Sequence, residues 1–159
     1  MTDENNVANQ EAAQQQFAIQ RIYVKDVSFE SPGAPEVFRA EFNPQLKVEM
    51  NSKSDALAEN VYNVDLTITV TAEQDEKTVY LVELTQSGIF TVSGVEGLNL
   101  RGTLSAYAPN ILFPYARAVI TDLVTQGGFP QLNLAPVNFD ALFAEQLRRE
   151  QEQAQGEST

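Results

Sequence analysis

The residues that could do chemistry in this chain are carboxylates, because the sequence contains no histidine and no cysteine. Their absence removes the commonest general base, the most frequent metal ligands and a thiolate nucleophile. Asp26 and Glu30 form one acidic pair that could be considered for glycoside hydrolysis. Four residues of extended strand separate them by about 13 Å, which is too far for either carboxylate arrangement that such enzymes use.

Other motifs for catalysis or cofactor binding are also missing. The sequence has no phosphate-binding loop, no dinucleotide-binding glycine pattern, no HExxH and no CxxC. Ser93 lies between an apolar strand and a predicted helix, but no GxSxG surrounds it and no histidine could activate it. The remaining candidate metal ligands show no convergent spacing: Asp55, Glu59, Asp65 and Glu73. We therefore expect neither an enzyme nor a bound cofactor or metal.

The charge balance excludes a further class of function. The chain has 159 residues, enough for one domain with a real core, and a net charge of −12. Nucleic-acid binding requires basic patches, so no nucleic acid is expected as a partner. The sequence has no apolar signal segment at its N-terminus and no apolar run long enough to cross a bilayer. We predict a cytoplasmic protein that does not insert into the membrane.

Alternating side chains predict a first strand over residues 17–30, after a polar and disordered tail over residues 1–16. Strand side chains alternate between faces, so Asp26, Ser28 and Glu30 share one face. The same alternation places Tyr23 with Val27 on the other face. The acidic face is either an ordinary solvated surface or a docking patch for another protein.

Three more strands are expected in the first part of the chain. Leu46, Val48 and Met50 alternate with polar residues, and residues 62–71 alternate most regularly of all. A polar turn over residues 74–77 predicts that the next strand pairs antiparallel with its predecessor. The two faces of that last strand hold Tyr80, Val82 and Leu84 on one side, and Leu81, Glu83 and Thr85 on the other.

Helices are predicted after the strands. Ser93 and Glu96 have the spacing of a capping box, which would open a short helix. A longer helix is predicted to start at Asn110 as its cap, with Pro114 in its first turn and an apolar stripe over residues 112–124. That stripe either lies under the sheet or also contacts another subunit.

The segment after Gly127-Gly128, which supplies a left-handed helix stop, is apolar but bracketed by two prolines. We expect residues 129–138 to form an extended strap over an apolar surface. A second helix capped by Asn138 follows, and residues 150–159 should form a frayed polar tail. Strands followed by helices predict an α+β fold, with the helices packed on one face of an antiparallel sheet.

Three segments resemble the SecB family of protein-export chaperones: IQRIYVKDVSFESPGAP, PNILFPYARAVITDLV and GGFPQLNLAPVNFDALF. The resemblance runs from Phe17 to Leu147 and implies a single domain over residues 17–149. It implies a four-stranded antiparallel sheet that assembles as a dimer of dimers, a homotetramer. It also implies an ATP-independent holdase that keeps unfolded secretory preproteins competent for translocation and delivers them to SecA, the translocation motor.

The same resemblance assigns roles to three sets of residues in this sequence. The positions that match the SecA-binding surface are Asp26, Ser28, Glu30, Leu81 and Glu83. Those that match the client-binding groove are Phe42, Leu46, Val48, Met50, Tyr80 and Phe143, for which an ordinary core position is the alternative. Those that match positions influencing tetramer assembly are Val82, Leu84 and Gln86. A competing hypothesis is an acidic cytosolic adaptor that binds one folded partner through its sheet face.

Overall fold

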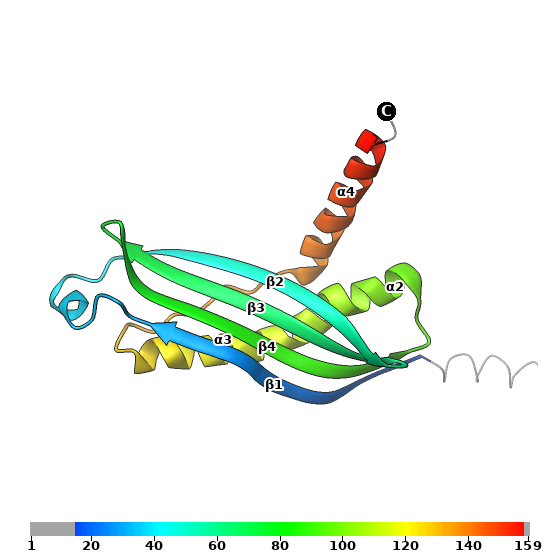
Figure 1. Ribbon diagram of the computed structural model, residues 1–159, viewed down its shortest axis with the longest axis horizontal. Coiled ribbons are helices and arrows are strands. Elements are labelled where there is room, and N and C mark those ends of the chain that lie inside the picture. Colours follow the sequence, from blue (N-terminus) through cyan, green and yellow to red (C-terminus); the bar gives the residue numbers. More distant parts are fainter. Residues whose placement is uncertain (1–14, 158–159) are drawn as a thin grey trace, which may run out of the picture.

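The computed structural model describes residues 15–157 and contains a four-stranded antiparallel sheet with the strand order β1-β4-β3-β2 (Figure 1). The strands are β1 (Gln16–Glu30), β2 (Gln45–Ala58), β3 (Val61–Gln74) and β4 (Lys77–Ser93). A short 3-10 helix, η1 (Glu36–Arg39), lies in the connection from β1 to β2. Strands β3 and β4 therefore form the centre of the sheet, and β1 and β2 are its edges.

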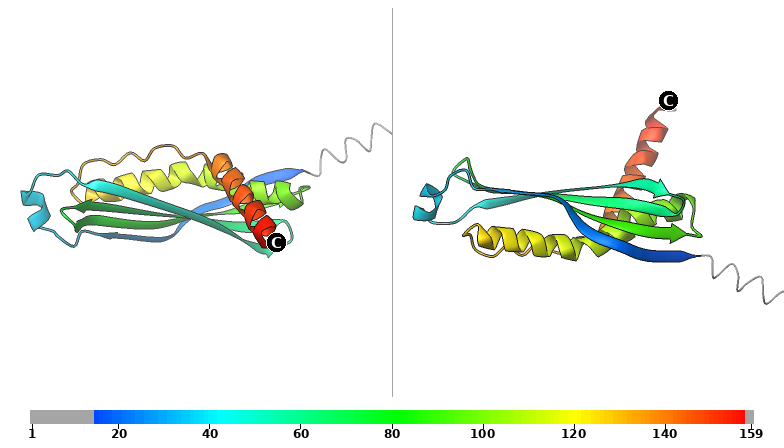
Figure 2. Two further views of the ribbon diagram at one scale, coloured as in Figure 1. Left: turned by 90° about the horizontal axis from the view of Figure 1, so that it is seen from above. Right: turned by 60° about the horizontal axis from the view of Figure 1, so that its bottom comes forward.

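Helices cover one face of this sheet. A short helix α2 (Gly97–Gly102) continues through a π-helical turn η2 (Thr103–Tyr107) into α3 (Ala108–Gln126), which lies along the sheet (Figure 2). Residues 129–138 then run back beside α3 without regular structure, and the Thr121 hydroxyl donates to the Leu132 carbonyl at 2.8 Å. The expected strap and the α+β fold with helices on one face are confirmed.

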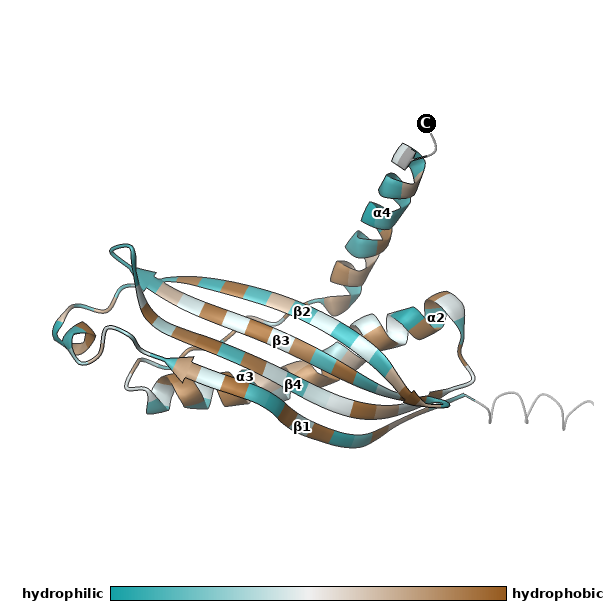
Figure 3. Cartoon of the chain, in the orientation of Figure 1, coloured by the Kyte–Doolittle hydropathy of each residue, from teal (hydrophilic) through white to brown (hydrophobic). Residues whose placement is uncertain are grey.

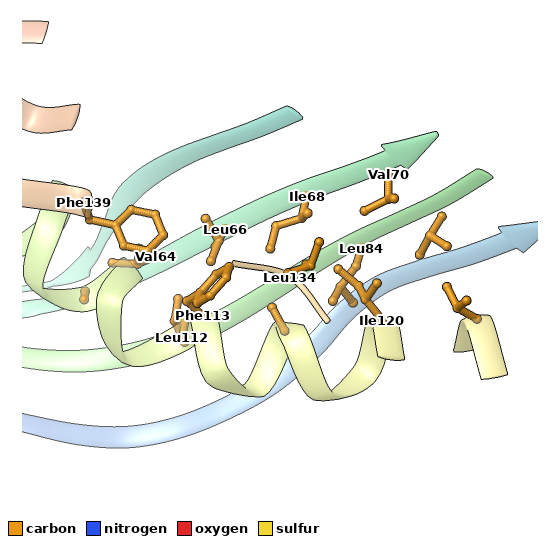
Figure 4. Packing of buried hydrophobic residues seen from close by; sticks show 14 of the residues in the cluster. Val64, Leu66, Ile68, Val70, Leu84, Leu112, Phe113, Ile120, Leu134 and Phe139 are labelled. Atoms are coloured by element: carbon orange, nitrogen blue, oxygen red, sulfur yellow. The ribbon is translucent and has the colours of Figure 1, made fainter. Parts of the chain in front are cut away.

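The core lies between the sheet and α3. There, apolar residues at every second position of a strand pack against apolar residues at helical spacing on α3. Alternate residues of β3 from Val64 to Val70 are fully buried, as are residues of α3 at helical spacing, such as Leu112 and Ile120 (Figure 4). Polar and apolar residues alternate visibly along the strands (Figure 3). Each such aliphatic side chain contributes about 1.5–3 kcal/mol when it is removed from water, so this layer accounts for most of the fold's stability.

The helix starts differ from those expected. The chain is already helical from Gly97, so Asn110 lies inside α3 and Pro114 lies in its interior, not in a first turn. The predicted capping box is wrong, because left-handed backbone at Gly94 (φ 77°) keeps the residues after Ser93 out of a helix. Glu96 is the residue before α2, and it makes no side-chain capping hydrogen bond.

Helix α4 (Phe139–Glu157) projects away from the body of the molecule (Figure 1). Asn138 caps it as predicted, since its Oδ1 accepts from the backbone N–H of Ala141 at 3.0 Å. Arg101 of α2 contacts α4 at two points. Its guanidinium donates to both carboxylate oxygens of Glu150, and it lies 5.9 Å from the centre of the Phe143 ring, near the base of the helix. The helix continues to Glu157, where a frayed tail was expected from residue 150.

Strand β1 contains two irregularities that shift its side-chain alternation. Its pairing with β4 skips one residue between Ile19 and Arg21, and another between Val24 and Asp26. Tyr23 therefore lies on the face opposite Val27, which corrects the simple alternation, whereas Asp26, Ser28 and Glu30 do share one face. Most of the predicted N-terminal tail, residues 1–14, lies outside the described residues. No helix within residues 15–157 is long and apolar enough to cross a membrane.

Candidate binding surfaces

The sheet face opposite α3, here called the outer face, carries the predicted acidic docking residues. Asp26, Ser28 and Glu30 project from β1 and are exposed. The strand register places Ser28 opposite Glu83 and Glu30 opposite Leu81 on β4. Paired residues of neighbouring strands lie on the same face, so the structure brings all five together into one strip: Asp26, Ser28, Glu30, Leu81 and Glu83. We call it the docking strip.

A buried carboxylate lies farther along the same outer face. Asp65 of β3 is only 1% exposed. Its Oδ1 accepts from the Ser87 hydroxyl at 2.5 Å and from the Asn63 amide at 2.8 Å, and its Oδ2 accepts from the Lys25 ammonium at 3.1 Å. The Tyr23 hydroxyl in turn donates to Asn63 at 2.6 Å.

The environment of Asp65 keeps it ionised. Burial alone would raise the pKa of the carboxyl group, but hydrogen bonds from Ser87, Asn63 and Lys25 together hold that pKa below its ordinary value of 3.8. The hydrogen bond and charge of Asp65 likewise raise the pKa of Lys25 above its ordinary value of 10.5. This charged network was missed in the sequence, because alternation assigns Asp65 to the polar face of its strand without indicating its partners.

The helix-covered face of the sheet carries a cluster of aromatic rings beyond the end of α3. Phe129 of the strap lies at its centre, with ring centroids 5.1 Å from Phe38, 5.8 Å from Phe42 and 5.0 Å from Tyr80. Phe38 and Phe42 remain 49% and 38% exposed, whereas Tyr80 is buried. Of the predicted groove residues, Phe42 is therefore accessible and Tyr80 belongs to the core. Phe38 and Phe129 were missed.

A cavity of about 340 Å³ opens between β2, η2 and the base of α4. Met50 and Phe143, both predicted for the groove, line it together with Leu66, Phe139 and Leu142. Leu46 and Val48 of β2 pair with buried residues of β3, so they lie on the helix-covered face of the sheet. Both are nevertheless exposed. An apolar track thus runs along edge strand β2 from the aromatic cluster to this cavity: Phe38, Phe42, Leu46, Val48, Met50, Leu142 and Phe143.

The three residues assigned to tetramer assembly lie inside the chain. Val82 and Leu84 are fully buried on the helix-covered face of β4, and Gln86 is nearly so. The Gln86 amide donates to the backbone carbonyl of Tyr23 at 3.0 Å. These residues sit in the layer covered by α3, so their side chains do not form an exposed contact surface in this chain.

Apolar side chains do remain accessible on α3 and along β1. Tyr115 of α3 is 52% exposed, and Ile19, Val24 and Val27 of β1 are also exposed. The register places these three β1 residues on the helix-covered side of the sheet, although α3 does not cover them. Within residues 15–157, no three acidic side chains gather in a way that could hold a metal ion.

Comparisons with known proteins give one consistent result. A family model described as "Preprotein translocase subunit SecB" matches residues 10–150. The protein-export protein SecB of Marinobacter nauticus is 51% identical over 150 residues, which cover 94% of this chain and 91% of that protein. Among solved structures, the SecB-like chaperone of Mycobacterium tuberculosis, in complex with a ChAD peptide from the HigA1 antitoxin, has a TM-score of 0.61 and 18% identity. The match covers 84% of this chain and 94% of that one, and it shows similarity of fold.

Proposed function

Because this chain belongs to the SecB family of protein-export chaperones, we propose that it holds unfolded secretory preproteins on the apolar track and presents the docking strip to SecA. One observation carries this proposal: large apolar side chains stay accessible after the chain has folded. Phe38, Phe42 and Leu46 are examples, and all lie on the helix-covered side of the sheet or beside it. An unfolded client exposes the matching apolar groups, so both surfaces leave water on binding.

The composition of the track suits clients of many sequences. Aromatic rings such as Phe42 bury a large area, and the flexible thioether of Met50 adapts to irregular partners. Binding of this kind is driven by the removal of apolar surface from water, and it requires no nucleotide. The track therefore fits a holdase that works without ATP.

The docking strip lies on the face opposite α3, whereas the track runs along the helix-covered side at β2. A client and SecA would thus occupy different faces of one sheet at the same time. Acidic residues such as Asp26 and Glu83 would attract a basic patch on the motor and speed its encounter with the loaded chaperone. This arrangement supports delivery of the client without its prior release.

We propose that four copies assemble as a dimer of dimers. The exposed β1 edge offers unpaired backbone groups and apolar side chains such as Val24 and Val27. Tyr115 adds an apolar contact on the free side of α3. Val82, Leu84 and Gln86 would influence assembly indirectly, by setting where α3 lies. Several tracks in one tetramer would bind a long client with avidity.

We further propose that the protein works in the cytoplasm, where preproteins exist before translocation, and that residues 17–149 form its chaperone domain. Helix α4 extends beyond this range, to Glu157, as an exposed charged arm.

The deciding experiment mixes the protein with one substrate in its chemically unfolded and its native form, and follows aggregation by light scattering. A holdase suppresses aggregation of the unfolded form and leaves the native form unbound. The adaptor hypothesis predicts the reverse: binding of a folded partner, and no protection of an unfolded chain. No suppression at a fourfold excess of chaperone chains, about one tetramer per client, would reject the proposed function.

A further inference from the structure

Strand β1 carries an extra residue at Lys25, and this residue decides which face the docking strip occupies. Val24 pairs with Gln86 of β4 and Asp26 pairs with the next β4 residue, Thr85, so Lys25 is an inserted residue without its own partner. An insertion of this kind is a β-bulge. Without it, continuous alternation from Val24 would place Asp26, and with it Ser28 and Glu30, on the helix-covered face.

The bulge is fastened from the outer face by the buried carboxylate. The Lys25 ammonium lies 3.1 Å from Asp65 Oδ2, and Asp65 is held in turn by Ser87 and Asn63 on the two central strands. Lys53 of β2 approaches the same oxygen at 4.0 Å. Asp65 therefore offers a fixed, ionised anchor to which the inserted residue of the edge strand is tied.

Apolar packing close to the bulge holds the strand only weakly. Val27, two residues beyond Lys25, is 43% exposed, whereas Phe29 is the first β1 residue after the bulge that packs on buried rings, with its centroid 6.1 Å from Tyr80. The register between Lys25 and Phe29 thus depends more on polar contacts than the register of the central strands does. A slip of one residue would also turn Phe29 away from Tyr80, so the polar contacts at Lys25 act together with this ring packing to set the register.

We propose that Lys25 and Asp65 are positioning residues for partner docking: their ion pair favours the bulged register, which turns Asp26, Ser28 and Glu30 to the outer face. This inference rests on the proposed docking of SecA through the strip. It adds two residues to the docking function that do not themselves need to touch the partner.

The test compares SecA affinity, measured by titration calorimetry, for Lys25→Met and for a matched control, Lys47→Met. Lys47 also lies on the outer face, in an exposed ion pair with Glu49 at 3.1 Å, and removing it deletes the same charge without touching the bulge. We expect Lys25→Met to weaken SecA binding about three- to fivefold, and Lys47→Met to leave it unchanged or slightly stronger.

The sign of the change separates positioning from simple electrostatics. A partner attracted by acidic residues should bind at least as well when a neighbouring lysine loses its charge, so weaker binding of Lys25→Met requires a change in the strip itself. Lys25→Arg keeps a cation that can reach Asp65 and should restore the wild-type affinity. Hydrogen exchange of the free protein should show faster exchange at residues 24–28 in Lys25→Met only.

SecA affinity is also measured for Asp26→Lys. This variant tests the docking surface itself, whereas Lys25→Met tests how that surface is positioned. If Asp26→Lys does not weaken SecA binding, the docking surface itself is wrong and the inference falls with it. If Asp26→Lys weakens binding while Lys25→Met behaves like Lys47→Met in both affinity and exchange, docking stands and the positioning role is overturned. Faster exchange with unchanged affinity also overturns it, because the bulge then has no bearing on docking.

Discussion

Replacing Asp65 with asparagine perturbs a buried charge on the outer face. The carboxylate accepts hydrogen bonds from Ser87, Asn63 and Lys25. Asparagine has a single acceptor oxygen, and its NH₂ group would face one of these donors. The loss falls mainly on the two buried contacts, because Lys25 is half exposed and water screens its ion pair. We expect the free energy of unfolding to fall by about 2 kcal/mol at pH 7.

The pH dependence of this loss follows from the lowered pKa of Asp65. A carboxyl group whose pKa is lower in the folded state stabilises the fold above its unfolded pKa, and this contribution disappears as the pH falls through the folded value. The ordinary pKa is 3.8. Asparagine does not titrate, so the difference between wild type and Asp65→Asn should be full at pH 7 and should shrink at pH values below 3.8.

Urea unfolding followed by circular dichroism at pH 7 and pH 3 measures this difference. Both proteins must be compared at one concentration, because subunit association adds to apparent stability. Asp55→Asn is the matched control, since Asp55 lies on the same face opposite Asn63 and is exposed; it should change stability by less than about 0.5 kcal/mol. A loss that is equal for both variants, or equal at both pH values, would refute the assigned role of Asp65.

Four further outcomes are expected. Glu83→Lys should weaken SecA binding at least tenfold (about 1.4 kcal/mol) in calorimetry while leaving client holding intact; equal affinity would contradict the docking strip. Phe42→Asp should reduce suppression of client aggregation severalfold, because it places a charge on the apolar track, and unchanged suppression would count against the track. Tyr115→Asp should lower the native mass in light scattering while the circular dichroism stays native; a persistent tetramer would reject α3 as an assembly surface. Leu84→Asp, by contrast, buries a charge in the core and should unfold the chain, so a folded dimer from it would disprove this account of Leu84.

The sequence predicted the central strands well because their alternation is regular over most of their length, and their mutual register shifts only near one end, between Ala72 and Glu73. Residues 64, 66, 68 and 70 of β3 are all buried, as a period of two requires. The same rule failed in the middle of β1, where two inserted residues shift the pattern. The inserted residues, Gln20 and Lys25, are not glycine or proline, the residue types that indicate an irregular strand. The faces on which Tyr23 and Val24 lie could therefore not be predicted from alternation alone.

The start of α3 illustrates a second limit. Asn110 and Pro114 are residues typical of a helix start, but the preceding residues continue as a π-helical turn and carry the helix through them. Burial of Leu104 and Ala106 against the core holds that turn in place. Tertiary packing therefore outweighed the local preference of Asn110 and Pro114 for a helix start. These residues correctly indicated a helix but not the position at which it begins.

The binding surfaces could be predicted only as far as one strand determines them. Alternation along each strand separately grouped the residues of the docking strip, but it did not predict the pairing of β1 with β4 that brings them together. Alternation alone could not decide between a groove and a core position for Tyr80, because the residue that covers it, Phe129 of the strap, is distant in sequence. Asp65 is buried for a related reason: long side chains of β1 reach across β4 to this part of β3, with Lys25 bonded to Asp65 and Tyr23 bonded to its neighbour Asn63.

The two proposed activities place opposite demands on one sheet, and its geometry reconciles them. Client holding requires apolar residues that remain uncovered, which is tolerable only at an edge such as β2, where α3 packs less than on the central strands. Partner docking requires acidic residues on a face that would stay free if α3 contacts another copy of the chain, as proposed for the tetramer. Alternation supplies both from the two faces of one sheet, the track at β2 and the docking strip at β1 and β4, provided that the register of β1 does not slip by one residue. The bulge at Lys25 is the point where such a slip would exchange the two faces, and a buried carboxylate fastens the strand there.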